Sequence, residues 1–158
     1  MSVDAVPTGT YVLLLKLPVE KTITIGKLGT FDFPAGWYTY IGSALGPGGL
    51  VARIKHHLQL QEKAHWHIDY LRREASLEEI WLSPDADRRE EDWVDLMIDI
   101  PGAAAFIEGF GASDSKHETH LFYFDIQPSL EDFAVGVRTR FPEAKVMRAY
   151  AGDVAPNE

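Results

Sequence analysis

The fold of this chain is decided by the stretch GWYTYIGSA at residues 36–44, together with the stretch GTYVLLLKL at residues 9–17. Both are rich in aromatic, β-branched and other apolar residues, a composition that favours β-strands. Residues 9–17 are so continuously apolar that their strand is expected to be buried on both faces. Residues 9–17 and, within the other stretch, residues 37–41 therefore predict main strands of a β-sheet, and the glycines from residue 42 to 49 predict a loop.

Two shorter stretches lie between these strands. Residues 22–25 and 31–33 alternate polar and apolar side chains, as half-buried strands do. Glycine and proline residues around them predict turns. We expect the opening of the chain to be an antiparallel meander that includes this extra hairpin.

The pattern becomes partly helical after residue 44. Helices are expected at residues 50–58, at 66–73, from Asp87 to about 97, and from Ser129 to just before Pro142, and strands at 77–82 and 120–124. The predicted class is α/β (α+β), a small central antiparallel sheet of about three main strands flanked by helices, with an extra N-terminal hairpin. We expect a single domain at residues 9–142, between a flexible tail at 1–8 and a C-terminal extension at 143–158.

The composition excludes several classes of protein. The 158 residues are 46% hydrophobic and 25% charged, which is ordinary for a globular domain and excludes disorder, collagen and coiled coils. The chain has no cysteine, so a disulfide scaffold, an iron–sulfur cluster and a thiol nucleophile are excluded. No apolar run near the N-terminus approaches the length that spans a bilayer. We therefore expect a cytoplasmic protein with no membrane partner.

The net charge of −9 argues against indiscriminate binding to nucleic acid, because attraction to phosphate depends on the charge of the whole surface. The charge is unevenly spread, however. Residues 85–99 are strongly acidic, whereas residues 50–75 are mildly basic and contain four of the six histidines. The second segment is therefore the expected place for phosphate contacts.

One set of residues suits the hydrolysis of phosphodiesters. The phenols of Tyr11 and Tyr40 can orient or deprotonate a water molecule if their protons are drawn off by neighbours. Arg53 offers a permanent cation whose planar fork matches a phosphate, and His57 follows one helical turn later. A carboxylate is needed to hold a divalent metal, and Glu91 is the favoured candidate.

With their neighbours, these residues make the chain resemble the GIY-YIG nuclease superfamily, and most closely its DUF123 branch. The motifs that carry the resemblance are GTY at residues 9–11, GWYTYIGSA at 36–44, Gly49-Leu50 with Arg53 and His57, HWHIDYL at 65–71, and GFGASD at 109–114 followed by HLFY at 120–123. The resemblance implies a small nuclease with an antiparallel sheet and DNA, or another structured nucleic acid, as its partner.

The resemblance also implies roles for single residues. Tyr11 would polarise the water with support from Tyr40, Arg53 would steady the phosphate, His57 would assist proton transfer, and Glu91 would bind Mg²⁺ or Mn²⁺. The nucleic acid would be contacted by further residues of the same motifs and of the first helix, namely Ser43, Gly49, Lys55, His67 and Ser113.

The chain departs from the family in ways that leave alternatives open. Its one asparagine, Asn157, cannot supply the asparagine that often completes the site, and Ser115-Lys116-His117 stands where relatives have cysteines. Glu90 competes with Glu91 as the metal ligand. The first alternative is a non-catalytic module that binds nucleic acid or protein. The second is a zinc hydrolase whose ligands would come from His65, His67 and Asp69, joined by His57, His117 and His120. The oligomeric state is left open.

Overall fold

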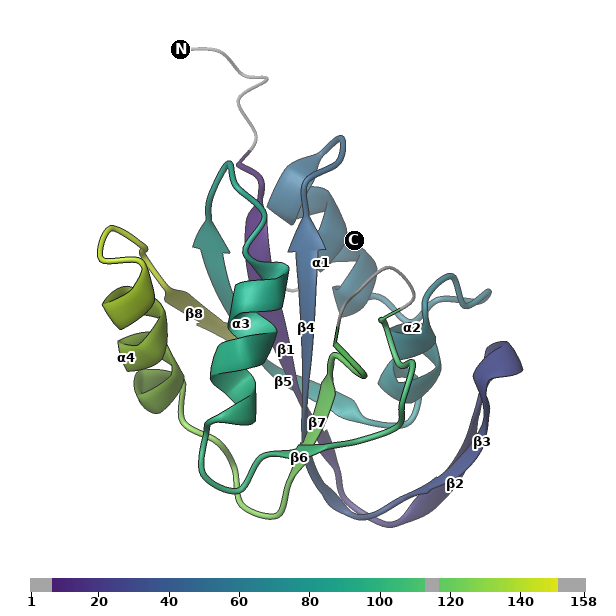
Figure 1. Cartoon of the computed structure of the whole chain (residues 1–158). Coiled ribbons are helices and arrows are strands. Elements are labelled where there is room, and N and C mark those ends of the chain that lie inside the picture. Colours follow the sequence, from purple (N-terminus) through teal and green to yellow (C-terminus); the bar gives the residue numbers. More distant parts are fainter. Residues whose placement is uncertain (1–6, 113–116, 151–158) are drawn as a thin grey trace.

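A six-stranded antiparallel sheet lies at the centre of the computed structural model, which describes residues 7–112 and 117–150 (Figure 1). The strand order is β6-β7-β4-β1-β5-β8. Its long strands are β1 (Gly9–Leu17), β4 (Gly36–Ala44) and β5 (Ser76–Pro84), and its short ones are β6 (Ala104–Ala105), β7 (Leu121–Phe124) and β8 (Met147–Tyr150). The prediction of a mixed fold with an antiparallel sheet is confirmed. Strands β6 and β8 were not predicted, because a strand of two or four residues is too short to show an alternating pattern. Strand β8 lies in the expected C-terminal extension and pairs with β5.

The predicted meander is wrong. Strand β1 pairs directly with β4 over its whole length, and β2 (Lys21–Ile25) pairs with β3 (Gly29–Phe33) in a separate two-stranded sheet. A short 3-10 helix at Gly26–Leu28 connects β2 to β3. Strand β1 is apolar on both faces and is covered on both edges by the long strands β4 and β5, whereas the exposed threonines of β2 suit a hairpin at the periphery. The extra hairpin itself is confirmed.

Helices cover both faces of the sheet (Figure 1). Helices α3 (Glu90–Ile98) and α4 (Leu130–Arg140) pack on one face, against the side chains of Val12, Leu14 and Trp81. Helices α1 (Gly49–Leu58) and α2 (His67–Arg72), with the β2–β3 hairpin, pack on the other face. Alternate residues of β1 point to opposite faces, so Tyr11 lies on the same side as α1.

Helix ends follow the predictions in part. Ser129 caps α4, since its side-chain oxygen accepts a hydrogen bond from the Asp132 amide, as expected. Helix α3 begins at Glu90 rather than at Asp87, and its preceding turn is held by Asp85, which accepts a hydrogen bond from the Asp87 amide. Within the described ranges, no helix combines the length and the apolar character needed to cross a bilayer.

Candidate active site

A pocket of about 390 Å³ opens where strand β4 ends and helix α1 begins. Its wall also includes the start of α3, the chain leading into α2, and the turn at Gly111. The lining residues are mainly polar, aromatic or charged: Tyr40, Gly42, Ser43, Arg53, His65, Trp66, His67, Arg88, Glu90 and Gly111. Segments that lie far apart in the sequence thus meet at one opening.

Tyr11 and His57 lie behind the wall of this pocket. Each is only 1% exposed, and the Tyr11 hydroxyl is hydrogen-bonded to His57 Nε2 at 2.8 Å. The absence of a side chain at Gly42, the cross-strand partner of Tyr11, makes room for the phenol, since a Cβ there would lie 2.5 Å from the Tyr11 oxygen. The strand pairing therefore holds the phenol against the imidazole.

Burial keeps both partners neutral. It raises the pKa of Tyr11 well above its ordinary value, although the charge and hydrogen bond of Arg53 oppose this shift. It also lowers the pKa of His57 from 6.5 to about 3, with a further contribution from the neighbouring His56. At pH 7 the pair is therefore a phenol beside a neutral imidazole, and the imidazole can accept a proton.

Tyr40 is the predicted phenol that lines the pocket itself. Its pKa lies well above the ordinary value, chiefly because of burial and then because of Tyr11 and Glu90 nearby. Gly111, with a backbone φ of +66°, lets the turn approach the ring closely, since a Cβ there would lie 2.8 Å from a Tyr40 ring carbon. The two predicted tyrosines thus occupy two layers, Tyr40 at the wall and Tyr11 behind it.

Arg53 is held in the pocket by two contacts. One guanidinium nitrogen donates a hydrogen bond to the Ser43 carbonyl oxygen at 2.7 Å, and the guanidinium carbon lies 4.5 Å from the centroid of the Trp66 ring. A cation over an indole face is attracted to it electrostatically. The arginine is therefore positioned before any ligand arrives.

Glu90 is the carboxylate that lines the pocket. It accepts a hydrogen bond from the Ser43 hydroxyl at 2.6 Å, and it forms ion pairs with Arg88 at 3.3 Å and with His120 Nδ1 at 2.7 Å. Burial alone would raise its pKa, but the hydrogen bonds from His120 and Ser43 outweigh burial, so the pKa of Glu90 lies below its ordinary value. The carboxylate is therefore ionised at neutral pH.

Glu91, the predicted metal ligand, is not among the residues that line this pocket. It contacts His117 Nδ1 instead, and one of its oxygens lies 4.0 Å from His120 Nε2. Adjacent residues on a helix point about 100° apart, so Glu90 faces Ser43 and Glu91 faces His117, while both approach His120. Sequence reasoning kept both glutamates as candidates but could not tell which one faced the tyrosines.

The six ligands of the predicted zinc alternative do not form one group, although His65 and His67 both line the pocket. His67 begins helix α2, so alternate residues there diverge, and His65 is exposed before the helix. Asp69 accepts hydrogen bonds from the amides of His65 and Trp66 and caps the helix. Those amides and His56 bring the pKa of Asp69 below its ordinary value although burial alone would raise it.

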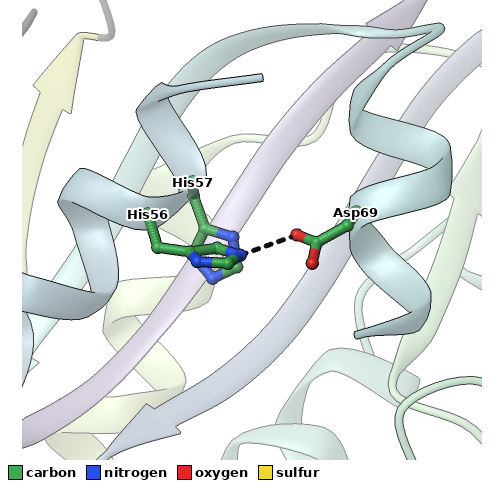
Figure 2. A group of neighbouring side chains, drawn as sticks. All are labelled: His56, His57 and Asp69. Atoms are coloured by element: carbon green, nitrogen blue, oxygen red, sulfur yellow. Dashed lines mark hydrogen bonds and ion pairs between the residues drawn. The ribbon is translucent and has the colours of Figure 1, made fainter. Parts of the chain in front are cut away.

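Asp69 has other histidine partners, from helix α1. Figure 2 shows His56 and His57 on consecutive positions of that helix, with the His56 ring facing Asp69. His56 Nε2 and an Asp69 oxygen are 2.9 Å apart, and the three side chains are close enough to share a metal ion. The Asp69 carboxylate already contacts two backbone amides and the His56 imidazole. This group therefore connects helix α1 to helix α2 and stabilises their packing.

The predicted nucleic-acid contacts are dispersed around the site. Ser43 and His67 line the pocket, and the Gly111 amide donates to His67 Nδ1 at 2.9 Å, which places the proton of a neutral His67 on Nε2. Gly49 opens helix α1 and lines a smaller pocket beside Arg53 and Trp66. Lys55 is exposed on α1 and does not line the main pocket, and Ser113 lies outside the described residues.

Two residues at this pocket were missed by sequence reasoning. Trp66 is half-buried and lies under the Arg53 guanidinium. Arg88 precedes helix α3 and pairs with Glu90. The HWHIDYL motif could have indicated Trp66, but no pattern in the sequence connects Arg88 with residues so distant along the chain.

Comparison with known families gives one match. A family model described as "Domain of unknown function DUF123" matches residues 10–141, which include all the residues named above as lining the pocket. No curated protein matches the chain. No solved structure matches it either.

Proposed function

Since the chain belongs to the DUF123 family, we propose on the geometry of its pocket that it is a metal-dependent endonuclease of the GIY-YIG kind, hydrolysing phosphodiester bonds in DNA or structured nucleic acid. The observation that supports this most is that the candidate residues from separate segments meet at one pocket. Arg53, Tyr40 and Glu90 line one pocket, and the Tyr11–His57 pair lies directly behind it.

Phosphate binding is assigned to the two arginines of the pocket. Arg53 and Arg88 both line it, and guanidinium groups match the geometry of phosphate oxygens. Arg53 is already oriented by the Ser43 carbonyl and the Trp66 ring, so little conformational entropy is lost when a phosphate binds.

Proton transfer is assigned to the tyrosines and His57. Tyr40 lines the pocket and orients the attacking water, while Tyr11 contacts Arg53 from behind and shares its proton with His57. His57 is neutral, with its pKa lowered to about 3 by burial, and negative charge brought into the pocket would raise that pKa and favour proton acceptance. A bound phosphate supplies that charge, which couples proton acceptance to substrate binding.

The donors at the pocket suit Mg²⁺ or Mn²⁺. The ionised carboxylate of Glu90 and the hydroxyl of Ser43 are hard oxygen ligands, and such ions in phosphate sites commonly take one or two carboxylates together with water and substrate oxygens. Glu90 and Ser43 would hold the ion. When bound there, it would stabilise negative charge on the leaving oxygen.

The test uses substitution of Arg53. Purified full-length protein with Mg²⁺ or Mn²⁺ is expected to nick a panel of plasmid, branched and single-stranded DNA substrates. Arg53→Ala should lower the nicking rate by roughly 100- to 1,000-fold, the loss found when a preorganised donor to a developing charge is removed. Arg53→Lys should recover only a small part of that loss, since lysine lacks the planar fork.

The matched control is Arg138→Ala, which removes an exposed arginine from α4 on the opposite face of the sheet. It should leave the nicking rate unchanged, and circular dichroism with thermal unfolding should show all variants folded. Equal nicking by wild type and Arg53→Ala would identify a contaminating nuclease and end the proposal.

A second function is favoured by the contacts of Glu90. Ser43, Arg88 and His120 already engage both of its oxygens, which suits a carboxylate with a purely structural role. The protein would then be a non-catalytic module that binds nucleic acid or protein. Binding to DNA with no cleavage under any divalent metal would select this function over the first.

A further inference from the structure

A second group of potential metal ligands lies beside the pocket, between helix α3 and the segment that precedes strand β7. Glu91, His117 and His120 each offer a donor atom, and these atoms all lie within 4.8 Å of one another. His120 is almost completely buried, whereas His117 and Glu91 are partly exposed. The group therefore combines one buried ligand with two partly exposed ones.

Each histidine of the group has a carboxylate at its far nitrogen. His120 Nδ1 lies 2.7 Å from a Glu90 oxygen, and His117 Nε2 lies 2.7 Å from an Asp95 oxygen. Histidines that bind metals usually donate their other ring N–H to a carboxylate, which fixes the tautomer and increases the basicity of the ligating nitrogen. Both imidazoles are therefore oriented as metal ligands are.

The near nitrogens of both rings face the same glutamate. His117 Nδ1 contacts one oxygen of Glu91, and His120 Nε2 lies 4.0 Å from the other. The 4.0 Å separation exceeds a hydrogen bond, while two donors on one zinc ion lie about 3 to 4 Å apart, because each bond is about 2.0–2.2 Å long. Small movements of the partly exposed Glu91 and His117 side chains would bring all three donors around a single ion.

The helix explains why this arrangement forms. Glu91 and Asp95 are four residues apart on α3 and so lie on the same face, one turn from each other. Both contact His117 from that face. Glu90 points toward the pocket and reaches His120 from the other side. Three acids of one helix thus surround two histidines of one segment.

We propose that Glu91, His117 and His120 form a binding site for a transition-metal ion of the Zn²⁺ class, separate from the oxygen ligands of the pocket. Imidazole nitrogens favour Zn²⁺, Co²⁺ or Ni²⁺ over Mg²⁺, which prefers oxygen. The ion joins α3 to the segment before β7 and fixes His120, and through it the position of Glu90. This site does not depend on the proposed nuclease reaction.

The group formed by His56, His57 and Asp69 is the weaker candidate for the same ion. Both oxygens of Asp69 are used, one by His56 and the other by two backbone amides. His57 Nε2 is bonded to the Tyr11 hydroxyl. A metal there would break several of these bonds, so this group supplies the control variant.

The experiment is metal titration of the full-length chain after treatment with a chelator. Isothermal titration calorimetry should show one equivalent of Zn²⁺ bound, Co²⁺ should give visible absorption bands, and Zn²⁺ should raise the Tm. His117→Ala and Glu91→Gln should each weaken Zn²⁺ binding by at least tenfold. Asp95→Asn should weaken it by roughly 10- to 100-fold, the usual effect of losing the partner of a ligating histidine.

The control His56→Ala should keep full Zn²⁺ affinity and the rise in Tm. Excess Mg²⁺ should not displace the ion. The proposal is overturned if the wild type takes up no stoichiometric Zn²⁺, or if uptake survives both His117→Ala and Glu91→Gln. Loss of uptake in His56→Ala alone would also overturn it and assign the ion to the other group. Because no readout is DNA cleavage, failure of the nuclease proposal leaves these outcomes unchanged.

Discussion

At the scale of single residues, the main feature of the site is the hydrogen bond between the buried, uncharged side chains of Tyr11 and His57. Burial raises the pKa of Tyr11 and lowers that of His57, so neither carries a charge at pH 7. A buried charge without a full set of partners would cost several kcal/mol. The neutral pair avoids that cost and still offers a site for a proton.

The lowered pKa of His57 predicts how stability depends on pH. In the unfolded chain this imidazole titrates near 6.5, and in the folded protein near 3, because burial disfavours the charged form. The contribution of neutral His57 to the unfolding free energy is therefore fully present above pH 6.5. It is lost as the pH falls toward 3, by about 1.4 kcal/mol per pH unit. Urea unfolding between pH 3.5 and 8 measures this.

The comparison variant is His57→Gln. It should be less stable at pH 7. Between pH 4 and 6, however, its unfolding free energy should change less with pH, because about one proton fewer is taken up on unfolding. Carboxyl groups that titrate in the same range affect both proteins, so the difference isolates the imidazole. Parallel curves for the two proteins would refute a neutral, buried His57.

At the scale of elements, the pairing of β1 with β4 does more than build the sheet. Their register sets Tyr11 opposite Gly42 and Leu13 opposite Tyr40, so both tyrosines lie on the face covered by α1. Helix α1 follows β4 after a short glycine-rich turn, which carries Arg53 back over the same face. The predicted site is thus a consequence of one strand pair and the helix after it.

Gly42→Ala tests this strand pair. A methyl group at Gly42 would lie 2.5 Å from the Tyr11 oxygen, and the buried ring has little room to move. We expect a loss of about 1–3 kcal/mol of unfolding free energy, typical of overpacking, together with a lower nicking rate. Chemical denaturation and the nicking assay measure the two effects.

Gly46→Ala is the matched control, since a Cβ at Gly46 would meet nothing within 4 Å. Its stability and nicking rate should stay within about 0.5 kcal/mol and twofold of wild type. If Gly42→Ala behaved like this control, the close approach of Tyr11 to β4 would not constrain the site.

At the scale of the whole molecule, charge decides which partners can bind. The net charge of −9 repels nucleic acid in general, whereas the described part of the pocket presents Arg53 and Arg88 beside one carboxylate, that of Glu90. Binding is therefore expected to depend on a few local contacts rather than on the field of the whole surface. Weak affinity with a shallow salt dependence should result.

Fluorescence anisotropy with labelled DNA in EDTA tests this expectation. Two or three phosphate contacts should make the affinity fall roughly 10- to 40-fold between 50 and 200 mM salt. Arg53→Ala should lower the magnitude of the slope of log affinity against log salt concentration by about one, since one phosphate contact is lost. Arg138→Ala should leave this slope unchanged. A slope as steep as that of strongly basic DNA-binding proteins would contradict the assignment of a local site.

The sequence predicted the elements well wherever a long pattern existed. Residues 9–17 form strand β1 and residues 50–58 lie in helix α1, as the patterns indicated. The strand predicted at residues 37–41 is longer than expected, because β4 (Gly36–Ala44) continues into the predicted glycine-rich loop. The edge strands β6 and β8 were not predicted, because they are short and neither has a buried face that would require apolar residues. The start of α3 was placed three residues early because its preceding turn is also rich in acids.

The sequence by itself determined the strands and helices that have a clear apolar pattern, and the residue types of the site, because periodicity and composition are local properties of the chain. Only the tertiary structure decided which strands pair, which tyrosine lines the pocket, and that Glu90 rather than Glu91 faces it. The reason is geometric. A shift of one residue on a helix turns a side chain by about 100°, and pairing between distant strands depends on which faces need burial, so neither can be read from neighbouring residues.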